Sequence, residues 1–479
     1  MYKLSKDLID GLKSKSINYC HWKSNLLLNE ALNGYDDLDL LVKKEDIHRF
    51  EILLHKLGFK RASNANLEIQ SVHHFYGYDE GTGEILHLHV YYEIKTGPSW
   101  TKSLRFNFEN YLLDNTIYHE SNVLVPEKHI EIVIFIIRVM MKYTKVNEYL
   151  LVRKESKRTI REIEYLLDGL NEKGIEEFLN LYFPKISLED FYKYIETIRG
   201  GGYIKKMLHA IQLKRKVKNY IYQGVLLNTR NNASQFVYRV LNKLLCKQKK
   251  NLVAGGALIA IVGLDATGKS TVSKDVKRWL GKNFTISHVH FGKPPSTLLT
   301  FPLNFVIKIL RKRISLQSEL RSSTKSMNKQ KSYMYMLRQL VLAYDRGSLV
   351  RKIWKKTAKG GIVLCDRYKS QDHGVMDSKR LIPDHYTSFK NKMASLENQI
   401  YDSMTAPDIM FYLTVSVELA VQRNEDRIKE GKESEEFLRH RHLENKNLSY
   451  NAKNLYEIDT NKEYSEVISE IKRIIWSVI

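Results

Sequence analysis

One octapeptide constrains the fold of this chain more than any other feature of its sequence. Residues 263–270 read Gly-Leu-Asp-Ala-Thr-Gly-Lys-Ser and match the pattern G-x-x-x-x-G-K-[ST] at every fixed position. The apolar run Leu258 to Val262 before it suits a buried parallel strand, and Ser270 to Leu280 after it has a helical composition with its charges on one side. The sequence therefore predicts a strand, a glycine-rich turn and a helix, an arrangement that binds phosphate groups.

We expect this loop to hold a nucleoside triphosphate, because a phosphate tail needs several donors close by and little steric bulk around them. Glycines let the backbone bend so that successive N–H groups point into one concavity at a helix N-terminus, where the helix dipole also favours anions. We expect Lys269 to bridge the β- and γ-phosphates of ATP and the Ser270 hydroxyl to ligate Mg²⁺. The predicted nucleotide-binding residues are Gly263, Leu264, Asp265, Ala266, Thr267, Gly268, Lys269, Ser270 and Thr271.

A second apolar strand, Gly361 to Asp366, ends in an acid that is followed at once by Arg367. In a parallel sheet this acid emerges at the carboxyl end of the strands, beside the phosphate loop, where ligands bind in such folds. We therefore expect Asp366 to help hold Mg²⁺ and Arg367 to neutralise a phosphate.

A third predicted strand, Ile409 to Val415, follows Ala406-Pro407-Asp408 and leads into a helix. This helix carries Arg423 and Arg427 one turn apart, so both guanidinium groups lie on one face. An arginine pair on a helix is by itself more often solvated, but beside a phosphate loop it is placed to cover a transferred phosphate.

From about Leu258 to the C-terminus, these pieces resemble the thymidylate kinase family of nucleoside monophosphate kinases. The matching segments, in the same order, are 263–265 before 268–271, Leu342-Ala343-Tyr344-Asp345-Arg346, Asp366-Arg367-Tyr368, and the strand before Arg423 and Arg427. The resemblance implies a P-loop phosphotransferase that uses ATP and Mg²⁺, with a mobile lid after residue 420. It implies catalytic roles for Lys269, Asp366, Arg367, Arg423, Arg427 and Asp265, and an acceptor bound by Asp265, Arg346, Arg367 and Tyr368.

The sequence departs from this family where the family recognises thymine. Leu342 stands where the family usually places a phenylalanine that stacks on the base, and Val262 stands where it has an acid before the first loop glycine. Residues 369–377 read Lys-Ser-Gln-Asp-His-Gly-Val-Met-Asp, without the small and amide residues that shape the family's base site. The phosphoryl-transfer residues are therefore better supported than thymidylate as the acceptor.

Near the N-terminus, residues 34–42 read Gly-Tyr-Asp-Asp-Leu-Asp-Leu-Leu-Val. Side chains alternate along a strand, so Asp37 and Asp39 share one face. Two converging carboxylates can hold the Mg²⁺ of a nucleoside triphosphate. Together with the preceding Ser24, the pattern resembles the nucleotidyltransferase superfamily to about residue 100, because in that superfamily a Ser-bearing turn precedes an Asp-x-Asp strand.

The second resemblance is incomplete at two places. The superfamily normally supplies a third acid from a nearby strand, but the candidate strand here carries His87, His89 and Tyr91 on that face, and Lys23-Ser24 replaces Gly-Ser in the turn. Two interpretations stay open, namely a working nucleotidyl-transfer site and a degenerate domain that binds a nucleotide or a partner. A weaker alternative is a zinc site built from four histidines, His73, His74, His87 and His89.

At 479 residues the chain is long enough for several domains, and its patterns separate three regions. We expect an α/β fold with a small nucleotidyltransferase-like domain over 1–120, a helical region and basic linker over 121–250, and a parallel-sheet P-loop kinase domain over 251–479. The expected middle helices are Glu127 to Tyr143, Lys157 to Leu170, Leu188 to Ile198 and Tyr203 to Tyr222, with breaks at Gly200-Gly201-Gly202 and Asn228 to Asn232.

The formal net charge is +23, and the segment Lys308 to Lys359 holds fifteen lysines and arginines against only Glu319 and Asp345. Such a surface attracts anions, so the expected partners are a nucleotide or sugar-like phosphoryl acceptor and, peripherally, an anionic membrane. Amphipathic helices that pack inward with their lysines outward explain the segment equally well. The sequence contains no recognisable nucleic-acid-binding motif.

The sequence also indicates a cellular compartment. No apolar run is long enough to cross a bilayer, and the first residues, Met-Tyr-Lys-Leu-Ser-Lys-Asp, form no apolar signal segment. The three cysteines, Cys20, Cys246 and Cys365, are scattered and form neither a disulfide framework nor a zinc pattern. We therefore expect a cytoplasmic protein, with the inner membrane face as a peripheral location.

Together these features predict an ATP- and Mg²⁺-dependent phosphotransferase of the nucleoside monophosphate kinase type with an unidentified acceptor. One alternative is a bifunctional protein that phosphorylates a sugar or polyol and activates the product with a nucleotide for surface polysaccharide synthesis. The other alternative is a non-enzymatic protein whose interactions are gated by a nucleotide.

Overall fold

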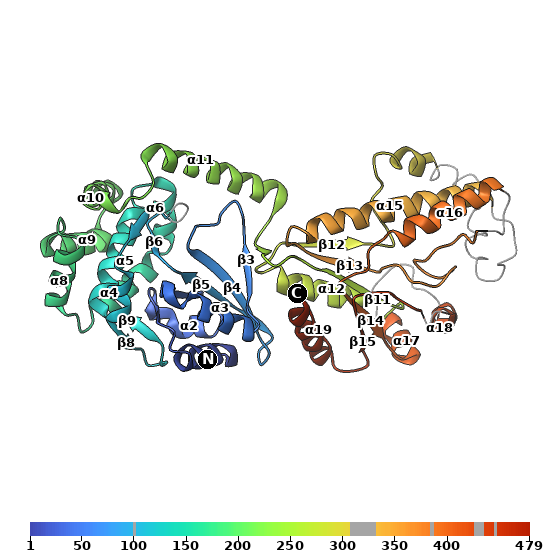
Figure 1. The fold of residues 1–479 in the computed structure, drawn as a ribbon, viewed down its shortest axis with the longest axis horizontal. Helices are drawn as coiled ribbons and strands as arrows, with labels where there is room; N and C mark the ends of the chain where they lie inside the picture. Colours follow the sequence, from blue (N-terminus) through green and yellow to red (C-terminus); the bar gives the residue numbers. More distant parts are fainter. Residues whose placement is uncertain (99–101, 307–331, 384–387, 426–434, 445–447) are drawn as a thin grey trace. The chain divides into compact units, whose positions relative to one another are not determined.

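The computed structural model describes residues 1–98, 102–306, 332–383, 388–425, 435–444 and 448–479 (Figure 1). The chain divides into two compact units, Met1–Gln248 and Lys249–Ile479. Arg427 and part of the basic segment, residues 307–331, lie outside the described residues. Among the helices that the structure describes, none is both long enough and apolar enough to cross a membrane.

The main sheet of the N-terminal unit is mixed and runs in the order β1-β2-β5-β4-β3. Only β2 and β5 pair in parallel within this order. Two small antiparallel pairs, β6-β7 and β8-β9, accompany the sheet. The strands are β1 (Tyr19–His21), β2 (Leu38–Val42), β3 (Lys60–Ser63), β4 (Val72–Asp79), β5 (Glu84–Tyr91), β6 (Ile94–Thr96), β7 (Leu104–Phe106), β8 (Thr116–Tyr118) and β9 (Leu124–Pro126).

Helices make up the rest of this unit. Their ends follow local signals, as at α9, where the Ser187 hydroxyl accepts a hydrogen bond from the backbone N–H of Asp190 and Asp190 returns the bond to form a capping box. The helices are α1 (Lys3–Ser14), α2 (Leu28–Leu32), α3 (Ile47–Lys56), α4 (Glu109–Asp114), α5 (Lys128–Lys142), α6 (Val146–Lys154), α7 (Ser156–Leu167), α8 (Glu172–Tyr182), α9 (Leu188–Gly200), α10 (Tyr203–Lys216) and α11 (Val225–Leu241).

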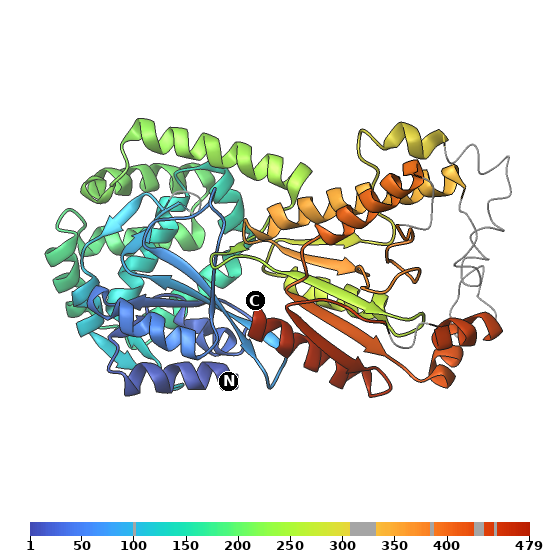
Figure 2. The same cartoon turned by 45° about the vertical axis from the view of Figure 1, so that its right-hand side comes forward.

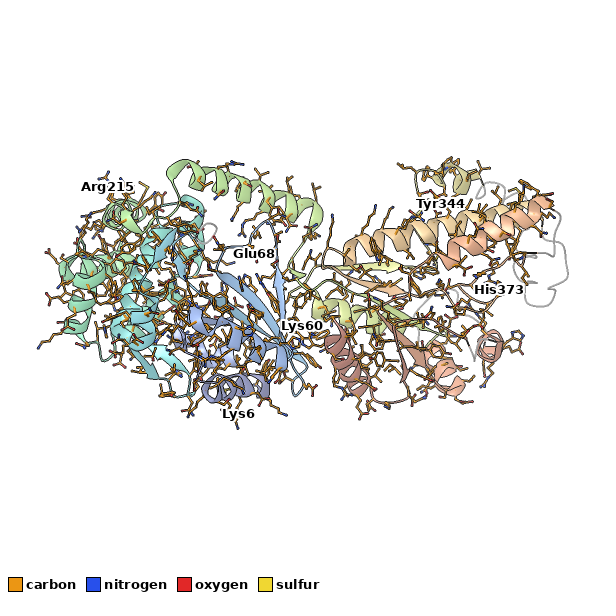
Figure 3. The ribbon with its side chains drawn as sticks, viewed as in Figure 1. Lys6, Lys60, Glu68, Arg215, Tyr344 and His373 are labelled. Atoms are coloured by element: carbon orange, nitrogen blue, oxygen red, sulfur yellow. The ribbon has the colours of Figure 1, made fainter. Side chains whose placement is uncertain are left out.

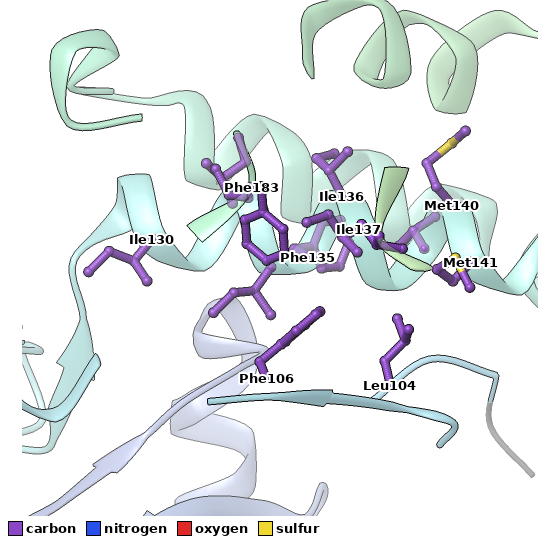
Figure 4. Close-up of a cluster of buried hydrophobic side chains, with 14 of the residues drawn as sticks. Leu104, Phe106, Ile130, Phe135, Ile136, Ile137, Met140, Met141 and Phe183 are labelled. Carbon is purple, nitrogen blue, oxygen red and sulfur yellow. The ribbon is translucent and has the colours of Figure 1, made fainter. Parts of the chain in front are cut away.

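Helix α5 forms the centre of a large core in this unit. It is apolar on nearly all sides, as expected for a helix surrounded by protein. Its side chains, such as Phe135 and Met140, pack with strand residues, such as Leu104 and Phe106, and with Phe183 beyond α8 (Figure 4). One continuous core therefore joins the sheet residues to the helices that follow residue 127.

The expected break at Asn228 to Asn232 was wrong. These residues lie inside α11, which is helical without interruption from Val225 to Leu241. Asparagine lowers helix stability by only about 0.7 kcal/mol relative to alanine. The neighbouring Leu227, Ala233 and Gln235 are compatible with a helix, so the asparagines do not end it.

The C-terminal unit contains a five-stranded sheet in the order β12-β13-β11-β14-β15, and every pairing is parallel. The predicted parallel-sheet α/β fold of this half is therefore confirmed. The strand β11, which precedes the glycine-rich loop, lies at the centre of the sheet. The strands of this sheet are β11 (Leu258–Gly263), β12 (Ile286–His290), β13 (Ile362–Asp366), β14 (Ile409–Thr414) and β15 (Asn454–Asp459), and the short strand β10 (Asn251–Leu252) lies outside it.

Helices cover both faces of this sheet, which explains why its central strands are apolar throughout (Figures 1 and 2). Helices α15 and α16 lie on one face. On the other face α12 and α19 meet through Trp279 and Trp476, whose ring centroids are 6.3 Å apart. The helices are α12 (Lys269–Leu280), α15 (Tyr333–Thr357), α16 (Ser388–Asp402), α17 (Val417–Glu425), α18 (Glu435–Glu444) and α19 (Tyr464–Val478).

The described part of the basic segment includes helix α15, and its charged residues differ in environment. Arg346 is buried, whereas Arg351 and Lys352 are exposed. Trp354 is also exposed, with 59% of its surface accessible. This helix therefore packs inward at some positions and presents an aromatic and basic surface at others.

Candidate functional site

The glycine-rich loop has the backbone geometry that its sequence predicts. Gly263 has a φ of +142°, and a Cβ at this position would lie 2.4 Å from the carbonyl oxygen of Leu413 on the neighbouring strand. Gly268 has a φ of +87°, and Ala266 has a φ of +63°. The loop thus needs glycine both for close packing against β14 and for its left-handed turn.

The loop places donors around the start of α12. The backbone N–H groups at a helix N-terminus favour anions, and α12 begins at Lys269 directly after the loop, with the N–H of Thr271 donating to the Gly268 carbonyl at 3.0 Å. The Lys269 ammonium donates hydrogen bonds to the Leu264 carbonyl and the Thr267 hydroxyl. The Ser270 hydroxyl is exposed in the first turn. This donor set fits the phosphates of ATP.

Asp366 ends β13 directly beside β11, where it pairs in register with Ile261. Its carboxylate accepts a hydrogen bond from the Ser273 hydroxyl on α12, and its Oδ2 lies 2.9 Å from Nε2 of His288. A carboxylate and the hydroxyl of Ser270 on the same helix are oxygen donors of the kind that Mg²⁺ binds together with water. Both residues therefore carry oxygen donors of the kind that a magnesium ion would need, and their role as its ligands stays a prediction.

Arg367 follows Asp366 with a left-handed backbone, at a φ of +66°. Its Nη2 lies 3.8 Å from Oδ1 of Asp265 in the loop. The other oxygen of Asp265 lies 2.7 Å from Nη1 of Arg441 on α18. The structure therefore brings the predicted pair Asp265 and Arg367 together and adds an arginine that sequence analysis missed.

Arg441 and Arg367 also meet at Met376. The Sδ atom of Met376 lies 3.0 Å from Nη1 of Arg367 and 3.7 Å from Nη2 of Arg441. Three segments distant in sequence thus converge beside the loop. The run Arg439-His440-Arg441-His442 was the one signal in the sequence that could have pointed to this helix.

Arg346 is the predicted acceptor residue that the structure places differently. Its side chain is buried, and its donors are used inside the protein by the Phe291 carbonyl, the Tyr401 hydroxyl and Asp377. Asp377 also lies 3.6 Å, through Oδ2, from Nη1 of Arg367. Arg346 therefore holds Asp377 through an ion pair, and Asp377 in turn contacts Arg367.

Tyr368 is likewise part of the core. Its hydroxyl donates a hydrogen bond to the carbonyl of Thr405, and its ring centroid lies 5.1 Å from that of Phe291. Burial raises the pKa of the Tyr368 phenol. These contacts anchor the start of the 369–381 segment.

A buried acid holds the C-terminal end of the 369–381 segment. Glu397 on α16 accepts hydrogen bonds from the backbone N–H groups of Arg380 and Leu381, at 3.2 and 2.8 Å. Burial raises the pKa of this carboxyl to about 7. The segment that carries Met376 and Asp377 is therefore fixed at both ends.

Arg423 lies in the last turn of α17 and reaches the end of β15. Its guanidinium donates hydrogen bonds to the hydroxyl and the carbonyl of Thr460, which follows β15. The structure does not describe Arg427, so it gives no geometry for the predicted arginine pair. Arg423 in this arrangement connects α17 to the end of the sheet.

Comparisons with known proteins address this C-terminal half. A family model described as "Thymidylate kinase" matches residues 261–471. Thymidylate kinase from Thermosipho melanesiensis is 26% identical over 223 residues, which cover 45% of this chain and 96% of the relative. The C-terminal half is thymidylate kinase-like.

Other similar proteins match the same half. The uncharacterized ATP-binding protein YghR of Escherichia coli is 24% identical over 234 residues, which cover 46% of this chain and 86% of the relative. Among solved structures, thymidylate kinase from Candida albicans is 19% identical with a TM-score of 0.27, and covers 47% of this chain and 92% of its own. The family match supports a nucleotide kinase function for the thymidylate kinase-like half.

The N-terminal unit brings its predicted acidic pair to one face of the sheet. Asp37 precedes β2 and Asp39 lies within it, while His87 and His89 project from the adjacent strand β5. Nδ1 of His87 lies 2.5 Å from Oδ1 of Asp37, and Nδ1 of His89 lies 3.1 Å from Oδ1 of Asp39. The face on which a third acid was expected therefore carries histidines that contact both aspartates.

Asp39 also has a cationic partner. Nζ of Lys23 lies 2.7 Å from Oδ1 of Asp39. Burial by itself would raise the pKa of Asp39, but Lys23 and the hydrogen bond to His89 hold it well below its ordinary value. Burial and the nearby Lys102 lower the pKa of His89 to about 3, so its ring is neutral at pH 7. Lys23 is thus the charge that offsets Asp39.

This arrangement does not fit a divalent cation as it stands, because an ammonium and two imidazoles contact the two carboxylates. Across the described ranges, no group of three or more histidines, cysteines or acids is arranged to hold a metal. His74 stacks on His87 and His89, with centroids 5.2 and 4.5 Å away, whereas His73 packs against Phe75 and Tyr92. Three of the four histidines, His74, His87 and His89, thus form a stacked polar face, and His73 is not part of it.

Proposed function

We propose that the C-terminal unit transfers the γ-phosphoryl group of ATP to a phosphorylated small molecule of the nucleoside monophosphate type. The observation that carries this proposal is the meeting of the loop after β11 with Asp366 and Arg367 at the end of β13, in a parallel sheet. In such sheets the carboxyl ends of adjacent strands form the ligand-binding edge.

The donor side of the site is built by the loop and α12. Backbone N–H groups at the helix N-terminus receive the phosphates, and the Lys269 ammonium exchanges its bond to the Leu264 carbonyl for the β- and γ-phosphates. Bound Mg²⁺ supplies charge neutralisation for the triphosphate, and Ser270 and Asp366 are the residues that would hold it. Ser273 and His288 orient Asp366.

The acceptor side is built around Asp265. Arg367 and Arg441 approach this carboxylate from two different segments and are the cations placed to offset charge on a transferred phosphoryl group. Arg346 and Asp377 are positioning residues, because Asp377 contacts Arg367 and Arg346 holds Asp377. In this proposal α18 supplies the arginine of the lid.

Leu342, in place of an aromatic residue, argues against a thymine base as the acceptor's main anchor. A sugar or polyol is therefore the second candidate acceptor for the same phosphoryl transfer. In the bifunctional alternative, the N-terminal unit also activates the phosphorylated product with a nucleotide. In the non-enzymatic alternative, the protein binds ATP without turning it over.

The test is ATP turnover by the full chain with a panel of nucleoside monophosphates, sugars and polyols, with and without Mg²⁺. Lys269→Met should abolish turnover, whereas Lys274→Met, which removes an exposed lysine from the same helix, should leave it within about twofold. ATP binding without turnover on any acceptor would support the interaction protein. A second, nucleotide-linked product that survives Lys269→Met but is lost in Asp37→Asn would support the bifunctional protein.

A further inference from the structure

The N-terminal unit contains a cavity of about 340 Å³ between the acidic end of β2 and helices α5 to α7. This volume is at the lower end of the range for small-molecule sites, roughly 300–1,000 Å³. The cavity lies entirely within this unit, so it is independent of the glycine-rich loop. The lining side chains that matter here are Trp22, Lys23, Tyr91, Lys102, Arg138 and Lys142.

Basic side chains crowd one wall of the cavity. Nζ of Lys102 and Nζ of Lys23 both donate to the Tyr91 hydroxyl, at 2.8 and 3.1 Å, so the two ammonium groups are close neighbours. Arg138 and Lys142 enter from α5, one helical turn apart. Burial, together with the charge of Arg138, lowers the pKa of Lys142. These cations therefore lie in a partly dehydrated site where they repel one another.

Carboxylates offset this wall only in part. The acids that line the cavity are Asp36, Asp37, Asp39, Glu155 and Glu162. Asp36 pairs with Arg158 at 2.7 Å, and Asp39 pairs with Lys23 at 2.7 Å. The nearest acid to Arg138 is Glu162, whose Oε1 lies 3.9 Å from Nη2. Over the residues that the structure describes, no carboxylate lies within 4.0 Å of the ammonium groups of Lys102 and Lys142.

A neutral donor points to the same kind of ligand. Trp22 lines the cavity and is almost fully buried, and its indole Nε1 has no hydrogen-bond partner in the described part of the chain. Buried donors and buried cations both carry a free-energy cost unless an acceptor reaches them. An anion with several oxygens satisfies such a set better than a single carboxylate does.

We propose that this cavity binds a phosphorylated small molecule directly, without a divalent cation between ligand and protein, through Lys102, Arg138 and Lys142. The ligand carries a negatively charged phosphate group, because among the described residues no carboxylate lies within 4.0 Å of the ammonium groups of Lys102 and Lys142. Its phosphate oxygens accept hydrogen bonds from the three cationic side chains. Asp37 and Asp39 keep their histidine and lysine partners and do not become metal ligands.

The test is calorimetric titration of inorganic pyrophosphate into the full chain carrying Lys269→Ala, which weakens the other phosphate site. The titration is run in Mg²⁺ and again in EDTA. Lys102→Met and Lys142→Met remove one charge each with little loss of side-chain length. Lys6→Met on α1 is the matched control, since Lys6 is an exposed lysine that does not line the cavity (Figure 3).

We expect one pyrophosphate per chain with a dissociation constant that EDTA does not change. A hydrogen bond to a charged group contributes roughly 1.5–3 kcal/mol, so each cavity variant should weaken binding by about ten- to a hundredfold, and Lys6→Met should not weaken it. Absence of binding, binding only in Mg²⁺, or binding that neither cavity variant weakens would each overturn the proposal. The EDTA comparison uses one protein, so it does not depend on the cavity variants folding.

Discussion

The Asp377 carboxylate lies 2.6 Å, through Oδ1, from Nη2 of Arg346, and both side chains are more than nine-tenths buried. The other two guanidinium nitrogens of Arg346 donate to the Phe291 carbonyl and the Tyr401 hydroxyl, so each of its three nitrogens has a partner inside the protein. The other oxygen of Asp377 faces Arg367 at 3.6 Å. A buried ion pair thus sets the position of an arginine at the proposed site of phosphoryl transfer.

Breaking this pair should destabilise the C-terminal unit. Asp377→Ala leaves the Arg346 charge buried without its carboxylate, a loss that typically amounts to about 3–5 kcal/mol. Asp402→Ala is the control, because Asp402 is exposed and its pair with Lys379 should contribute less than about 1 kcal/mol. Denaturant unfolding followed by tryptophan fluorescence measures both variants. Equal losses in the two would show that the Arg346–Asp377 pair is not the buried anchor described here.

Arg441 should matter for catalysis and little for stability. Its pair with Asp265 is partly exposed, so Arg441→Gln should change the free energy of unfolding by less than about 1 kcal/mol. If Arg441 offsets charge in the transition state, the same change should lower kcat by roughly a hundredfold. Arg439→Gln on the same helix removes an arginine that pairs with Glu435 instead, at 2.8 Å. Steady-state kinetics that give both variants the wild-type kcat would remove Arg441 from the mechanism.

Gly263 should tolerate no side chain. Gly263→Ala places a Cβ 2.4 Å from the Leu413 carbonyl oxygen and requires an alanine at a φ of +142°, so β11 must shift away from β14. We expect loss of ATP binding and a loss of stability of about 2 kcal/mol or more. Gly200→Ala is the control, since nothing lies within 4 Å of its Cβ position. Retained ATP affinity in Gly263→Ala, measured by calorimetry, would contradict the close approach of these strands.

The buried Glu397 should make stability depend on pH. Its pKa is about 7 in the folded protein against an ordinary value of 4.5, so between these values the folded state holds a proton that the unfolded chain has released. The contribution of Glu397 to the free energy of unfolding therefore falls as the pH rises from 4.5 to 7, by up to about 3 kcal/mol.

Glu397→Gln carries no such proton and should lose this dependence. Its free energy of unfolding relative to the wild-type protein should rise as the pH is raised from 5 to 7. Glu466→Gln, which alters an exposed acid on α19, should follow the wild-type profile. Denaturant titrations at pH 5, 6 and 7 measure the three proteins, and parallel profiles for Glu397→Gln and wild type would show that the acid is not buried in its protonated form.

Much of the C-terminal half was predictable because its signals are local. The apolar run before Gly263 indicates a buried strand, and the glycines after it indicate a turn. Asp366 directly follows a second apolar run, which places it at the end of a strand. The parallel sheet follows from such strands, because helices must cover both faces. Arg441 and Asp377 gave no comparable signal, since each acts through a partner far away in the sequence.

The N-terminal half shows the same division. Alternation along the chain was enough to place Asp37 and Asp39 on one face, because the direction of side chains in a strand has a period of two residues. Whether the pair binds a metal depends on what stands opposite, and those groups are His87, His89 and Lys23. The expected break at Asn228 to Asn232 failed for a related reason, since weak local preferences do not by themselves end a helix.

The amino-acid sequence by itself determined the glycine-rich loop with the strand before it and the helix after it, whereas the residues that hold a triphosphate stay a prediction. Only the tertiary structure decided which charges meet, including the burial of Arg346 against Asp377, the approach of Arg441 to Asp265 and the basic wall of the N-terminal cavity. The physical reason is the range of the interactions. Backbone conformation depends on near neighbours in sequence, whereas ion pairs and buried cavities depend on side chains that only the folded chain brings within a few ångströms of each other.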